Sequence, residues 1–166
     1  MNAHATRPRP KLAKDESRPL SERNVAPIVA AVDGSTASRA AIGEAVRLAA
    51  ELSAPIVFVY VRRGPAGVFG APVYERRLTT AMARARRVLD RALAVADSAG
   101  VPAEGEILEG SPRRRISEFA RDRSARLIVV GSRPRKLGQS VSTGVIRSAG
   151  RAVIVARSMP QLAAAA

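Results

Sequence analysis

Two short segments of this chain combine glycine, serine and charged residues in the way that phosphate-binding loops do. Gly131-Ser132-Arg133 directly follows the apolar run LIVV, and Asp33-Gly34-Ser35 follows the apolar run PIVAAV. Glycine lets backbone N–H groups come close to phosphate oxygens, and the start of a following helix favours negative charge. Ser140 and Ser142 add two hydroxyl groups at a predicted helix start. The pattern indicates a site that holds phosphate, built from two separate strand ends.

Other kinds of chemistry have little support among the residues. His4 is the only histidine and lies in the N-terminal tail, so histidine-based catalysis and metal binding are not expected. The chain has no cysteine, which excludes a disulfide framework, a thiol nucleophile and a cysteine metal site. No second carboxylate or histidine is placed to activate water. We therefore expect a binding protein rather than an enzyme, with no catalytic residue and no metal ligand.

The composition fits one domain with tails. The chain has 166 residues, 46% of them apolar, with three phenylalanines, two tyrosines and no tryptophan, so the core must consist of Val, Ile, Leu and Ala. The sequence has no apolar run near the roughly 18 residues of a membrane span and no apolar signal core. These features favour an intracellular, cytoplasmic location and no membrane association.

Positive charge is spread over the whole chain. The net charge is +14, and only three of the 28 basic residues are lysines. Such a charge favours contact with polyanions, although arginines on solvated faces would give the same composition. Nucleic-acid binding as the main task would require stacking aromatic residues or a recognisable module, and neither is visible. Residues 113–115, three arginines at a predicted helix start, fit either a solvated face or an anionic partner.

The elements that position the two segments alternate between strand and helix patterns. Runs rich in valine and isoleucine predict strands at 27–32, 56–61, 106–109, 127–130 and 152–156. All but 106–109, which is typical of an edge strand, are almost continuously apolar, as strands buried on both faces are. Apolar residues at steps of three and four predict helices at 37–52, at 74–99, from Ser111-Pro112 onward, and at about 140–149.

This alternation predicts an α/β fold, an open doubly wound parallel sheet of five strands with helices on both faces. The domain should span residues 25–158, between a disordered basic tail at 1–24 and a short C-terminal tail at 159–166. In such sheets a ligand binds beyond the carboxyl ends of the strands, where the winding direction reverses. Asp33 and Gly131 should therefore meet there.

The order of these motifs resembles the universal stress protein family. The resemblance rests on AVDGS, VYV, EGSP, LIVVGSR, SVS and AVIVA, and it covers about residues 26–157. It implies a cytoplasmic, usually dimeric, UspA-like domain with strand order 3-2-1-4-5. In the nucleotide-binding branch of the family, ATP lies at the junction of strands one and four. Asp33 and Val61 would line its adenosine part, and a loop of pattern Gly-x2-Gly-x9-Gly-Ser/Thr would wrap its phosphates.

The loop after the fourth strand departs from that pattern. Gly131 matches the first glycine, but Pro134 stands at the second and Gln139 at the third. Proline has no N–H and a fixed φ, so it can neither donate to phosphate nor adopt a positive φ. Four residues separate Pro134 from Gln139, where the pattern has nine. We predict a shortened, degenerate loop, in which side chains would bind phosphate in place of the missing backbone N–H groups. Those side chains are Ser140, Ser142, Arg133, Arg135 and Lys136.

Two functions follow from this reasoning. The first is a stress-response regulator that weakly binds ATP or AMP, with or without Mg²⁺. The second is a family member without a nucleotide, acting through dimerisation and contact with a partner protein or a polyanion. A third possibility, a slow nucleotide hydrolase, lacks a residue placed to act as a base. Asp33 itself could have a structural role only, in the turn before the helix. The predicted nucleotide site consists of Asp33, Gly34, Ser35, Val61, Gly131, Ser132, Arg133, Gly138, Ser140, Val141 and Ser142.

Two further segments suggest contacts with partners. The run AVIVA at 152–156 is apolar and should lie at a sheet edge, which is a liability unless it is covered or paired. It therefore predicts a homodimer through the last strand, as the resemblance also does. The loop at 62–73 begins at the carboxyl end of the second strand, and Phe69 in it is a candidate lid or partner contact, unless it packs on the core.

Overall fold

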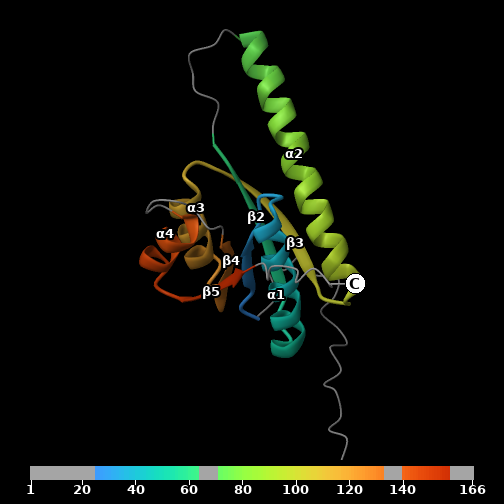
Figure 1. The fold of residues 1–166 in the computed structure, drawn as a ribbon, viewed down its shortest axis with the longest axis vertical. Coiled ribbons are helices and arrows are strands. Elements are labelled where there is room, and N and C mark those ends of the chain that lie inside the picture. Colours follow the sequence, from blue (N-terminus) through green and yellow to red (C-terminus); the bar gives the residue numbers. More distant parts are fainter. Residues whose placement is uncertain (1–24, 64–70, 133–139, 158–166) are drawn as a thin grey trace, which may run out of the picture.

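The computed structural model describes residues 25–63, 71–132 and 140–157. Strands and helices alternate along these ranges (Figure 1). The elements are β1 (Ile28–Ala31), α1 (Thr36–Leu52), β2 (Ile56–Arg62), α2 (Ala71–Ser98), β3 (Ala103–Glu109), α3 (Pro112–Asp122), β4 (Leu127–Ser132), α4 (Val141–Ser148) and β5 (Ala152–Arg157). The predictions for the two tails, for Phe69 and for the segment 133–139 concern residues outside the described ranges.

The described strands form one parallel sheet in the order β3-β2-β1-β4-β5. β1 lies at its centre, where Ile28 is in register with Ile56 of β2 and with Leu127 of β4. The chain leaves β1 toward β2 and β3 and later crosses back to β4 and β5, so the winding direction reverses between β1 and β4. The predicted doubly wound α/β fold and its strand order are confirmed.

The core consists of two layers, one on each face of the sheet. Ile28 and Ala30 of β1 point into the layer under α1 and α2, while Val29 points into the layer under α3 and α4. Small residues of the helices, such as Ala45 and Ala92, are fully buried against the strands. Strands covered on both faces need apolar side chains at every position, which explains the continuous apolar runs. Figure 1 shows α1 and α2 on one side of the sheet and α3 and α4 on the other.

Some element boundaries differ from the prediction. β3 begins at Ala103 rather than 106, because all seven of its residues pair with β2 although the first four, AEGE, have no apolar pattern. Its predicted edge position is confirmed. α2 begins at Ala71, and its N-terminal half projects beyond the sheet (Figure 1). Ser111 is the N-cap of α3 and Pro112 its first residue, as predicted, but the Ser111 side chain makes no capping hydrogen bond.

Among the helices of the described ranges, none has the length and hydrophobicity needed to cross a membrane.

Candidate functional site

The turn between β1 and α1 is held by a short series of hydrogen bonds. Asp33 Oδ1 accepts from the Ser35 N–H at 2.9 Å, and the Asp33 N–H donates to Ser38 Oγ at 3.1 Å. The N-cap of α1 is Ser35, whose Oγ accepts from the Ser38 N–H at 3.1 Å. Asp33 thus shapes the turn that precedes the helix, while its side chain stays exposed at the end of β1. One carboxylate oxygen serves the turn, and a carboxylate can accept further hydrogen bonds.

Two glycines of the predicted site lie within the described residues, and each has a packing reason. Gly34 has φ +80°, and a Cβ there would lie 2.9 Å from Val88 Cγ2 of α2. At Gly131 a Cβ would lie 2.3 Å from the backbone oxygen of Ala37, in the first turn of α1. Gly131 therefore lets the end of β4 approach the start of α1 closely. This packing alone is a sufficient reason for a glycine at position 131.

Hydroxyl groups gather at the start of α4. Ser140 is the N-cap, and its Oγ accepts from the Thr143 N–H at 3.1 Å. The same Oγ lies 2.8 Å from Ser142 Oγ and 2.8 Å from Thr143 Oγ1. These hydroxyls can donate to an anion, and the helix start adds a favourable field. Thr143 was missed by the sequence reasoning, although its position three residues after a serine cap is a recognisable signal.

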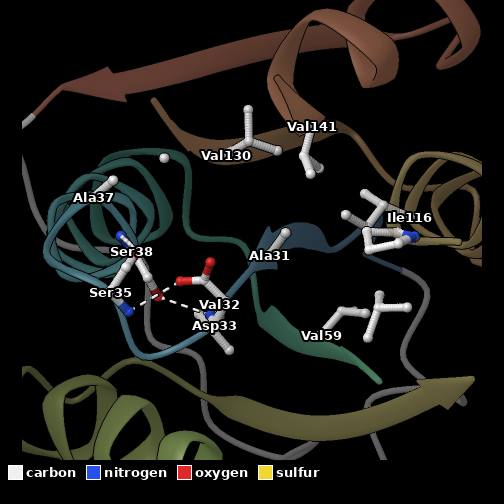
Figure 2. Close-up of a pocket in the computed structure, with 13 residues that line it drawn as sticks. Ala31, Val32, Asp33, Ser35, Ala37, Ser38, Val59, Ile116, Val130 and Val141 are labelled. Carbon is white, nitrogen blue, oxygen red and sulfur yellow. Dashed lines mark hydrogen bonds between the residues drawn. The ribbon is translucent and has the colours of Figure 1, made fainter. Parts of the chain in front are cut away.

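A cavity of about 110 Å³ opens at the carboxyl ends of β1 and β4. Figure 2 shows the Asp33 carboxylate beside Ala31, with Val59, Ile116, Val130 and Val141 around the rest of the cavity. Asp33 is the one charged side chain among the described residues that line it. The described wall is mostly apolar, and its polar side chains are the Asp33 carboxylate and the hydroxyls of Ser35 and Ser38. Such a wall suits a flat, weakly polar group that carries a hydroxyl or an N–H donor.

The predicted site residues divide into three groups. Asp33, Ser35, Val61, Gly131 and Val141 all line this cavity. The described residues Gly34, Ser132, Ser140 and Ser142 lie in the adjoining turns and ends of elements, outside its lining. Arg133 and Gly138 lie outside the described residues.

Two residues of α3 also line the cavity, although the sequence reasoning did not assign them to it. Pro112 and Ile116 line it from the first turns of α3. Pro112 was predicted only as part of a helix start. Their part in the cavity depends on how α3 packs on the sheet, which no local sequence signal encodes. Among the described residues, no group of three or more His, Cys, Asp or Glu side chains could hold a metal ion.

The strand order defines a doubly wound α/β domain, with a small cavity where the winding direction reverses between β1 and β4. The family model "Universal stress protein family" matches residues 24–157, and the chain belongs to the universal stress protein family. This confirms the resemblance found in the sequence. No curated protein matched the chain.

Several solved structures are similar. A universal stress protein family member from Burkholderia pseudomallei is 30% identical, with 77% of this chain and 93% of that chain covered and a TM-score of 0.65. UspA from Lactobacillus plantarum is 27% identical, with 80% and 98% covered and a TM-score of 0.70. The universal stress protein from Archaeoglobus fulgidus, in complex with dAMP, is 26% identical, with 79% and 97% covered and a TM-score of 0.63.

Proposed function

We propose that this chain is a non-catalytic stress-response regulator that binds an adenine nucleotide, AMP or ATP, weakly in the cavity between β1 and β4. The observation that carries the proposal is the position of Asp33 beside the apolar walls of Val59, Val61 and Val130. An adenine base would pack on these walls, and the Asp33 carboxylate would accept a hydrogen bond from a ribose hydroxyl. The dAMP complex of the Archaeoglobus fulgidus relative supports this choice of ligand.

Weak binding is expected from the groups that the described residues offer to phosphate. The hydroxyls of Ser140, Ser142 and Thr143 are neutral donors at the start of α4. A neutral hydrogen bond contributes about 0.5–1.5 kcal/mol net, against about 1.5–3 kcal/mol for a charged one. Two of these hydroxyls already bond to Ser140, so phosphate would exchange one partner for another. Mg²⁺ would then reach the protein through the phosphates of the nucleotide.

One observation favours a second function, in which the protein acts without a nucleotide. The cavity of about 110 Å³ is smaller than the roughly 300–1,000 Å³ of most small-molecule sites. The packing of Gly131 on Ala37 also accounts for that glycine without any ligand. In this case the protein would act through dimerisation and contact with a partner.

We also propose that the protein is a cytoplasmic homodimer that pairs through β5. β5 lies at the edge of the sheet next to β4, and its central residues Val153, Ile154 and Val155 remain partly exposed. Pairing with a second copy would cover this apolar edge.

Nuclear magnetic resonance of the isotope-labelled protein tests the nucleotide proposal. Titration with AMP, ATP and cyclic AMP, each with and without Mg²⁺, should shift the amide signals of Asp33, Val61 and Gly131 in a saturable manner. Absence of any shift at millimolar nucleotide would leave the nucleotide-free function, and shifts confined to other residues would place the ligand elsewhere.

A further inference from the structure

A second, larger cavity lies between the carboxyl end of β2 and the N-terminal half of α2. It has a volume of about 480 Å³, and the described residues that line it include five arginines and no acidic residue. We call it the arginine groove; its arginines are Arg62, Arg63, Arg76, Arg77 and Arg84. The groove exists because α2 begins well beyond the end of the sheet and returns past the end of β2 (Figure 1).

The charges of α2 are segregated around the helix. At 3.6 residues per turn, five of its six arginines lie within an arc of about 100°, on the side that faces the groove. They are Arg76, Arg77, Arg84, Arg87 and Arg91. Glu75, Asp90 and Asp97, the acidic residues of α2, lie with Arg86 in a separate arc of about 60°. The helix therefore concentrates positive charge along one side, where a randomly charged solvated face would mix both signs.

Arg62 gives the groove an unsatisfied donor. Its Nη2 pairs with Glu109 Oε2 of the neighbouring strand β3, and its side chain is only 15% exposed. Its Nη1 is buried and donates to no acceptor in the described part of the chain. A buried, unpaired donor on a charged group is costly, so the guanidinium would gain from turning this Nη1 toward an oxygen bound in the groove.

The arginine groove is distinct from the nucleotide cavity. Val61 lines both, but its side chain belongs to the layer under α3 and α4, whereas Tyr60 belongs to the layer under α1 and α2. Adjacent side chains of a strand point to opposite faces, so the two cavities lie on opposite faces of β2. A ligand in one of them does not occupy the other.

We propose that the arginine groove binds a chain of three or more phosphates, either inorganic or attached to a nucleoside. Guanidinium groups bind phosphate oxygens in pairs, and a phosphate chain carries many charges in little volume. The groove has the volume of a small-molecule site, and Arg76 to Arg84 span about 12 Å along the helix. Among the described residues that line the groove, Tyr60 is the one aromatic residue and is half-buried. These residues therefore offer no row of aromatic rings on which successive bases could stack.

Calorimetric titration of the full chain with sodium tripolyphosphate tests the proposal. The double variant Arg76→Gln/Arg84→Gln should bind at least about tenfold more weakly, because two charged contacts are lost. The control variant Arg86→Gln/Arg121→Gln loses the same charge from exposed sites outside the groove. Its affinity should stay within about twofold of that of the unmodified chain. Circular dichroism confirms that all variants fold.

Equal weakening in both double variants would overturn the proposal, because it would reduce the effect to overall charge. Tighter binding of single-stranded oligothymidylate than of tripolyphosphate would make the groove a nucleic-acid surface instead. If the groove variant binds both tripolyphosphate and ATP more weakly, the proposal stands. The ligand that the unmodified chain binds more tightly then shows whether the phosphate chain is inorganic or attached to a nucleoside.

Discussion

Gly131 occupies a position at which packing requires a residue without a side chain. A Cβ there would meet the backbone of Ala37, which cannot move without shifting the start of α1. Gly43 of α1 is a useful contrast, since a Cβ there would meet nothing within 4 Å. Replacing glycine by alanine should therefore have opposite effects on stability at the two positions.

This contrast gives a prediction for stability. Gly131→Ala should lower the free energy of unfolding by about 1–3 kcal/mol, since the methyl group overpacks a backbone contact. Gly43→Ala should raise it by about 0.5–1 kcal/mol, because alanine is the better helix residue at an open position. Urea unfolding followed by circular dichroism measures both. Equal stability of Gly131→Ala and the unmodified chain would contradict the close approach of β4 and α1.

At the scale of elements, ionic contacts hold the edge strand β3 to the fold. Arg123, at the end of α3, pairs with Glu104 at 2.9 Å and with Glu106 at 3.0 Å. Its guanidinium carbon also lies 5.1 Å from the centre of the Phe119 ring. These side chains are partly exposed, so each pair contributes modestly, although one guanidinium joins three partners. The polar start of β3, which the sequence reasoning missed, is thus explained by its partners on α3.

We expect Arg123→Ala to lower the free energy of unfolding by about 1 kcal/mol at low salt. The loss should shrink in about 1 M NaCl, where surface charges are screened. Arg126→Ala, which removes an exposed arginine near the same end of α3, should cost less than about 0.5 kcal/mol. Urea melts at the two salt concentrations give the comparison, and a loss that is independent of salt would argue against ionic contacts.

Features of the fold that depend on the local sequence could be predicted, and features that depend on how the elements pack could not. Buried parallel strands are apolar throughout, so LIVV and IVFVYV could be recognised and the fold predicted from their order. The meeting of Asp33 and Gly131 followed from topology alone. Pro112 in the cavity and Arg62 in the arginine groove could not be predicted. Their positions depend on how α3 and α2 pack, and packing is a property of the whole fold.

At the scale of the whole molecule, the edge strand β5 predicts the oligomeric state. Ile154→Lys places a charge in the middle of this strand and should give a monomer, since pairing of two such edges would bury charge at the interface. Multi-angle light scattering should report twice the chain mass for the unmodified protein and one chain mass for the variant. A variant that remains a dimer would exclude β5 as the interface.

The nucleotide proposal concerns the cavity at the carboxyl ends of β1 and β4. Calorimetric titration with adenosine and AMP, on the unmodified chain and on Asp33→Ala, tests that cavity most directly. We predict binding of both ligands, weakened about tenfold or more for each in the variant, because a charge-assisted hydrogen bond worth about 1.5–3 kcal/mol is lost. Absence of heat with either ligand at millimolar concentration, or equal affinity in a folded Asp33→Ala variant, would contradict it.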